Sequence, residues 1–103
     1  MAQKESEKGI QSAILKYLEL RKVFAWRQNS GAFKTERGGF YHLGISGAPD
    51  IFILKGGVIY ACEVKTKTGK LNPNQISFKE RFEKAGGVYF IARSVQDVIS
   101  LKI

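Results

Sequence analysis

The stretch GAPDIFILKGGVIYACEVK, residues 47–65, carries the strongest structural signal in the chain. Two apolar segments, Asp50 to Leu54 and Val58 to Lys65, are joined by Lys55-Gly56-Gly57, a pattern that predicts a β-hairpin. Because the strands of a hairpin run antiparallel, the start of the first strand lies beside the end of the second. The hairpin therefore brings Asp50 close to the charged end of the second strand.

That charged end is the sequence Glu63-Val64-Lys65, followed shortly by Lys67. Side chains alternate between the two faces of a strand, so Glu63, Lys65 and Lys67 are expected on one face. Cys62 and Val64 are expected on the other face, toward the core. We expect the charges to lie where the strand meets solvent, and an ordinary exposed Glu–Lys face is the simplest alternative to a functional site.

Further helices and strands are predicted on both sides of this hairpin from hydrophobic periodicity and capping residues. They are a helix over Ser6 to Leu20 with Ser6 as N-cap, a short strand over Val23 to Arg27, a helix opened by Asn72-Pro73 and ending near Ala85, a strand over Val88 to Ala92, and a short helix capped by Ser94. The order helix, strands, helix, strand, helix predicts an α/β fold (α+β, mixed sheet), with helices packed on the sheet. Residues 1–103 are interpreted as a single domain.

The segment from Gln28 to Gly47 is polar and rich in glycine, which indicates a long loop with a loose hairpin turning at Gly38-Gly39. A loop of this length in a small domain is usually functional or disordered. The aromatic side chains elsewhere are interpreted mainly as core, with some available for a subunit interface. They are Phe24, Trp26, Phe52, Phe78, Phe82, Tyr89 and Phe90.

The charge balance favours a polyanionic partner. The chain has 17 Lys and Arg against 9 Asp and Glu, a net charge of +8. Nucleic acid is the first candidate and an anionic membrane surface the second, while a basic protein without such a partner is the alternative. A single Cys62 and a single His42 exclude a Cys/His zinc site within one chain. With no apolar run that could span a bilayer and no secretory signal, an intracellular location is expected.

Two carboxylates at one end of a sheet are able to hold a hard divalent cation. Here they are Asp50 and Glu63, and the backbone carbonyl of Val64 could add a third oxygen. A bound metal acidifies its water and stabilises charge developing on a phosphate, and Lys65 could position the attacking water or stabilise the transition state. Without a metal, adjacent carboxylates would repel both each other and a phosphate backbone.

Gly47-Ala48-Pro49-Asp50 followed by Glu63-Val64-Lys65 resembles the pattern of PD-(D/E)xK nucleases. Features along nearly the whole chain resemble one branch of them, the virus-type replication-repair nuclease (VRR-NUC) domain. These features are Glu7 with Ile10-Gln11, Arg27 to Gly31, Gly69-Lys70-Leu71 followed by Gln75, and the segment Ser94–Asp97–Val98. The resemblance implies a restriction-endonuclease-like core.

The resemblance also implies roles for individual residues. Asp50 and Glu63 would be metal ligands together with the Val64 carbonyl, and Lys65 would be the catalytic lysine. Glu7 would be an acidic residue near the metal, unless it is a solvated glutamate favoured by the helix dipole. Gln75 would orient water or phosphate, unless it is a surface residue of the first helical turn.

The resemblance implies a Mg²⁺- or Mn²⁺-dependent DNA endonuclease associated with phage and bacterial replication or repair. It would act as a homodimer on branched DNA such as four-way (Holliday) junctions. Alternatives are a monomeric nicking or flap-directed nuclease, a nucleic-acid-binding module without catalysis, and a small protein–protein adaptor. Basic and polar residues are candidates for phosphate contacts, which give affinity without sequence readout. These candidates are Arg27, Asn29, Lys34, Arg37, Lys67 and Lys70.

Overall fold

The computed structural model describes residues 6–28, 31–34 and 36–103, with only the backbone described for 31–34 and 40–43. Its elements are α1 (Glu7–Leu20), β1 (Phe24–Arg27), β2 (Gly31–Lys34), β3 (Phe40–Leu43), β4 (Ile51–Lys55), β5 (Val58–Val64), α2 (Pro73–Lys84), β6 (Val88–Ala92) and α3 (Val95–Ser100). The predicted helices and strands are present, with ends within a residue or two of those expected.

Four strands form one mixed sheet in the order β1-β4-β5-β6. Strands β4 and β5 form the predicted antiparallel hairpin, with Ile51 opposite Cys62. Helix α2 then crosses over, so that β6 pairs in parallel with β5 and Phe90 lies beside Cys62. The predicted mixed α/β sheet is confirmed, and β5 lies between two neighbouring strands.

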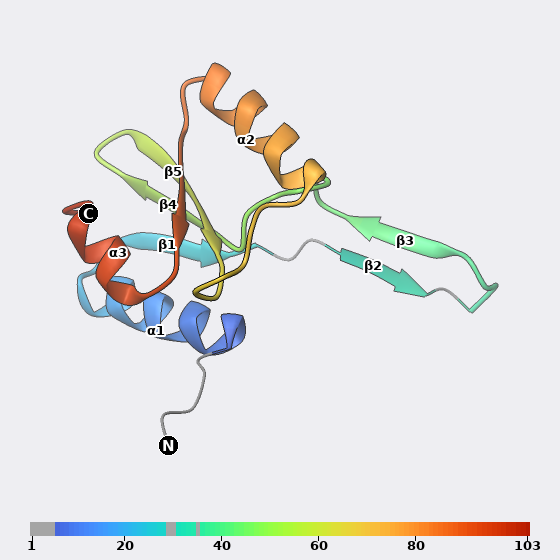
Figure 1. The fold of residues 1–103 in the computed structure, drawn as a ribbon, viewed down its shortest axis with the longest axis horizontal. Coiled ribbons are helices and arrows are strands. Elements are labelled where there is room, and N and C mark those ends of the chain that lie inside the picture. Colours follow the sequence, from blue (N-terminus) through green and yellow to red (C-terminus); the bar gives the residue numbers. More distant parts are fainter. Residues whose placement is uncertain (1–5, 29–30, 35) are drawn as a thin grey trace.

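The helices lie on both faces of the sheet (Figure 1). Helices α1 and α3 cover one face, where the main core contains Ile14, Leu18, Ile53, Cys62 and Val98. Helix α2 covers the opposite face beside β6 and encloses a smaller core. None of the described helices combines the length and apolarity needed to cross a bilayer.

Capping residues set the start of each helix. The Ser6 hydroxyl accepts a hydrogen bond from the Gly9 amide at 3.0 Å, as its N-cap position predicts. Helix α2 begins at a full capping box between Asn72 and Gln75. Ser94 occupies the N-cap of α3 but makes no capping bond with its side chain. The Asp97 carboxylate accepts the amide of Arg93 instead, at 2.8 Å.

The segment expected to be mostly loop contains the β2–β3 hairpin. Its strands pair antiparallel, with Lys34 opposite Phe40, which bears out the loose hairpin predicted around Gly38-Gly39. Figure 1 shows the hairpin projecting away from the sheet, and none of the other described elements makes an extensive contact with it. The chain therefore extends two paired strands into solvent beside the main domain.

The β1 side of the α2-facing surface is left uncovered. Phe24 is 67% exposed and Trp26 is 36% exposed, and Leu54 and Ile59 beside them are also exposed. Among the aromatic residues interpreted mainly as core, Phe24 and Trp26 are exposed instead, because α2 lies over β6 and does not reach the other edge of the sheet. These four residues are called the open face below.

Candidate active site

The β4–β5 hairpin places Asp50 and Glu63 opposite one another. Ile51 pairs with Cys62, so one step further along the ladder brings Asp50 beside Glu63. The Asp50 carboxylate accepts a hydrogen bond of 2.7 Å from the Val64 amide, which ties the start of β4 to the end of β5. The proximity predicted from the hairpin is therefore present, and a backbone contact holds it.

Glu63 is buried, with 3% of its surface exposed, and its Oε1 atom has no hydrogen-bond partner. The expectation that the charges of this strand meet solvent is wrong for Glu63, because β5 is a central strand flanked by β4 and β6. Burial raises the pKa of Glu63 to about 9, and the neighbouring Asp50 carboxylate adds to the increase. A carboxyl group in this position is protonated at neutral pH unless a cation accompanies it.

Lys65 follows β5 directly and lies on the same side of the strand as Glu63. Its amide donates to the Ala92 carbonyl at 3.1 Å, so the main chain continues beside β6 at this point. The positive charge of Lys65 lowers the pKa of Glu63 and so opposes the effects of burial and of Asp50. The predicted trio of Asp50, Glu63 and Lys65 thus lies together at one end of the sheet.

Glu7 lies in the first turn of α1, where its charge also raises the pKa of Glu63. It is exposed and belongs to the helix on the other face of the sheet. Within residues 6–28, 31–34 and 36–103, no three His, Cys, Asp or Glu side chains gather as a metal-holding group. The structure therefore brings Glu7 toward the site without placing it beside Asp50 and Glu63 as a third ligand.

Gln75 has a local structural contact. The Gln75 side-chain oxygen Oε1 accepts a hydrogen bond from the backbone N–H of Asn72 at 2.9 Å. The backbone N–H of Gln75 donates to Asn72 Oδ1, also at 2.9 Å. The side-chain oxygen is therefore engaged in capping α2. A contact with a phosphate oxygen would need the side-chain nitrogen Nε2 of Gln75, because phosphate oxygens accept hydrogen bonds.

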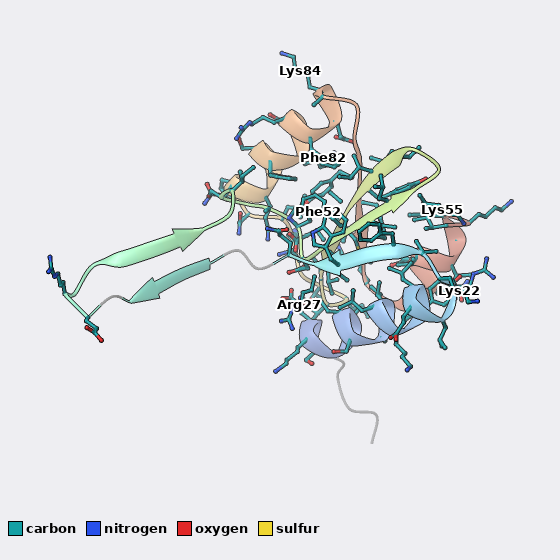
Figure 2. All side chains as sticks on the ribbon, turned by 180° about the vertical axis from the view of Figure 1, so that it is seen from behind. Lys22, Arg27, Phe52, Lys55, Phe82 and Lys84 are labelled. Atoms are coloured by element: carbon teal, nitrogen blue, oxygen red, sulfur yellow. The ribbon has the colours of Figure 1, made fainter. Side chains whose placement is uncertain are left out.

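The predicted phosphate contacts spread over two regions. Arg27 is exposed at the end of β1 (Figure 2), and Lys67 and Lys70 are exposed in the segment after β5. Arg37 is exposed between β2 and β3, and the backbone of Lys34 lies in the same hairpin. Asn29 lies outside the described residues.

An apolar cavity of about 370 Å³ lies on the α2 side of the sheet. Phe52 and Ile59 form its floor, and Phe78 and Phe82 of α2 form one wall. Figure 2 shows Phe52 and Phe82 directed toward one another in this region. The predicted motifs do not reveal this cavity, although Phe78 and Phe82 at i and i+4 place two rings on the same side of α2.

A solved structure described as a "VRR_NUC domain" is similar to this chain over 95% of its length and 96% of that structure. The two share 29% sequence identity, and the TM-score is 0.67. The chain folds as a VRR-NUC domain. A scan against family models and a search of curated proteins give no match.

This likeness over nearly the whole chain supports a VRR-NUC domain, a type of nuclease domain. Cys62, beside the trio on the other face, is buried as expected, and burial raises the pKa of its thiol. Its thiol is therefore unreactive at neutral pH.

Proposed function

We propose that this VRR-NUC domain is a metal-dependent DNA endonuclease with its active site at Asp50, Glu63 and Lys65. The observation that carries the proposal is the buried Glu63 carboxyl, whose Oε1 lacks a partner and which lies beside a second carboxylate. Buried polar atoms without partners are rare in native proteins and call for an explanation. A divalent cation would satisfy Oε1 and remove the repulsion between the two carboxylates.

The residues present fit a hard cation. Asp50 and Glu63 supply carboxylate oxygens, the Val64 carbonyl is the proposed third oxygen, and Mg²⁺ characteristically keeps several waters. Such an ion supplies Lewis acidity and a more acidic water. Lys65 would orient the attacking water or stabilise the charge developing on the phosphate. The role of Glu7 as a further acidic residue near the metal stays a prediction.

Cleavage of labelled DNA in Mg²⁺ or Mn²⁺, compared with EDTA, tests the proposal. We expect cutting that requires the metal and that Asp50→Asn lowers by about a hundredfold or more, because a ligand and the Val64 contact are weakened together. Binding measured in Ca²⁺ should persist in this variant. Glu19→Gln, on the exposed side of α1, removes the same charge remote from the site and should cut normally.

Equal cutting by Asp50→Asn and Glu19→Gln would refute the site assignment. Binding without cutting by the unmodified protein in both metals would favour the alternative of a non-catalytic nucleic-acid-binding module. We also propose an intracellular setting, in a bacterium or a phage-infected cell, where replication and repair of branched DNA take place.

The open face supports a homodimer as the working form. Contiguous exposed apolar surface marks interaction sites in folded proteins, and Phe24 is 67% exposed within it. The β2–β3 hairpin, which follows the other end of β1 from Phe24, has no extensive contact with the other described elements, and isolated two-stranded hairpins are marginally stable in water. A second copy would cover both features. A two-fold dimer presents two active sites, which suits paired incision of a four-way junction.

Sedimentation of the unmodified protein and of Phe24→Glu tests the dimer. We expect a dimer that Phe24→Glu converts to a monomer, because a buried unpaired charge at an interface is costly. Paired junction incision should then become single nicks. Gln96→Glu adds the same charge to the exposed side of α3 and should remain dimeric. If the unmodified protein is a monomer and prefers flap or duplex substrates to junctions, the result would favour the alternative of a monomeric nicking or flap-directed nuclease.

A further inference from the structure

We propose that Arg93 is a positioning residue for Lys65, acting through the turn formed by residues 66–69. The inference rests on the proposed nuclease function for its catalytic consequence, but its structural part is independent of that function. Arg93 immediately follows β6 and was not singled out by the sequence motif. Its side chain reaches across to the segment that leaves β5.

One guanidinium nitrogen of Arg93 donates to three backbone carbonyls of this turn. Arg93 Nη1 lies 2.6 Å from the Thr66 oxygen, 2.9 Å from the Gly69 oxygen and 3.3 Å from the Lys67 oxygen. The turn is also closed internally, because the Gly69 amide donates to the Thr66 carbonyl at 3.1 Å. The Arg93 side chain therefore fixes both ends of the turn.

Two contacts hold the base of the Arg93 side chain in place. The Arg93 amide donates to Asp97 Oδ2 at 2.8 Å, which joins it to α3. The preceding Ala92 carbonyl accepts the Lys65 amide at 3.1 Å. The main chains at Arg93 and Lys65 thus run side by side, and a rigid strand presents the guanidinium to the turn.

The turn of residues 66–69 confines the Lys65 side chain. A methyl group built on Gly69 would lie 3.3 Å from Lys65 Cδ and 3.4 Å from Lys65 Cβ. The Gly69 backbone therefore packs directly along the aliphatic stem of Lys65. If the turn moved away, the stem would lose this wall and gain rotamers that carry its ammonium away from Asp50 and Glu63.

Arginine suits this role better than lysine does. A guanidinium is planar, permanently charged and weakly hydrated, and it presents its donors in a fixed geometry. A lysine ammonium is a compact, strongly hydrated group on a flexible stem. It would keep the charge but would hold the three carbonyls less rigidly. Arg93→Lys therefore separates the geometric contribution of Arg93 from its charge.

Single-turnover cleavage by Arg93→Lys, Lys65→Met and the double variant tests the proposal. We expect Arg93→Lys to lower the rate constant at saturating DNA by about tenfold to a hundredfold, the cost of misplacing a reacting group by about 1 Å. In the Lys65→Met background the same change should have almost no further effect, because the group it positions is gone. If Arg93→Lys lowered the rate only by weakening the fold, it would have the same effect in both backgrounds. The rate losses of the two single variants would then multiply in the double variant. Arg21→Lys, at the exposed end of α1, is the matched control and should cut normally.

Amide exchange and side-chain NMR provide a readout that does not depend on cleavage. In Arg93→Lys the Gly69 amide should exchange at least about tenfold faster, since its closed turn loses the carbonyl contacts that restrain it. The methylene signals of Lys65 should shift toward rotamer-averaged values. An unmodified protein that cuts no DNA would refute the nuclease proposal and leave these NMR expectations standing. Unchanged exchange and Lys65 signals, or multiplicative rate losses in the double variant, would overturn the role of Arg93.

Discussion

Glu63→Gln is expected to abolish DNA cleavage while making the metal-free protein more stable. Cleavage should fall by about a thousandfold or more, equivalent to roughly 4 kcal/mol in the barrier, because the amide is a poor substitute for a carboxylate ligand. Stability should rise because glutamine has nearly the shape of the protonated acid and never ionises. Opposite effects on activity and stability are typical of residues whose burial serves function.

The gain in stability should depend on pH. Burial raises the pKa of Glu63 from 4.5 to about 9, so the folded protein retains a proton that the unfolded chain has lost between these values. The contribution of this group to stability is therefore fully present below about pH 4.5 and is lost progressively as the pH rises to 9. In EDTA at pH 8, Glu63→Gln should raise the melting temperature by at least ~4 °C, which corresponds to about 1 kcal/mol in a domain of this size.

Melting curves from pH 5 to pH 9 check this expectation. The difference between Glu63→Gln and the unmodified protein should widen with pH. Glu80→Gln, which removes an exposed carboxylate of α2, should show no such trend. A Glu63→Gln protein that is destabilised at pH 8, or that cuts DNA normally, would contradict the proposed reason for burying this carboxyl.

Gly47→Ala is expected to cause the largest loss of stability among single changes near the site. Gly47 has φ +78°, a region that side chains with Cβ rarely adopt. A methyl group there would overlap the carbonyl oxygen of Asn74 and lie 2.9 Å from the Gln75 nitrogen. Both obstacles belong to the backbone, so neither can rotate away. We expect a loss of about 3 kcal/mol from strain and overlap together.

This loss should also reach the active site. Gly47 lies three residues before Asp50, and Asn74 and Gln75 lie in the first turn of α2. Pushing them apart shifts the segment that leads into Asp50, so cleavage should fall even where the protein remains folded. Urea denaturation and cleavage at a temperature below the transition measure the two effects.

Gly56→Ala is the matched control for Gly47→Ala. Gly56 has φ +60° but no atom within 4 Å of an added Cβ, so it isolates the backbone strain. We expect a loss of about 1 kcal/mol and normal cleavage. Equal losses for the two variants would mean that the close approach of Gly47 to α2 contributes nothing.

Local signals in the sequence were sufficient for most of the fold. Apolar segments on both sides of Lys55-Gly56-Gly57 predicted the β4–β5 hairpin, and antiparallel pairing alone brought Asp50 beside Glu63. Ser6 and Asn72-Pro73 predicted two helix starts, and the side chains of Ser6 and Asn72 both make capping bonds. These features depend on neighbours within a few residues or on the period of a strand, so they are predictable from the sequence without a tertiary structure.

Several site features depend on strand order and helix placement. The burial of Glu63 follows from the central position of β5, which only the addition of β6 creates. The exposure of Phe24 follows from the limited reach of α2 across the sheet. The contacts of Arg93 join segments 24 to 27 residues apart in the sequence. No local pattern encodes such distant neighbours.

The hairpin of residues 47–65 thus determined which residues of this protein meet at the end of the sheet. The tertiary structure decided their surroundings: Glu63 buried with an unpartnered oxygen, Lys65 confined by Gly69, and the open face left uncovered. The reason is physical. Pairing register is set by the period of the strand and its turn, whereas burial and electrostatics depend on every element that packs nearby.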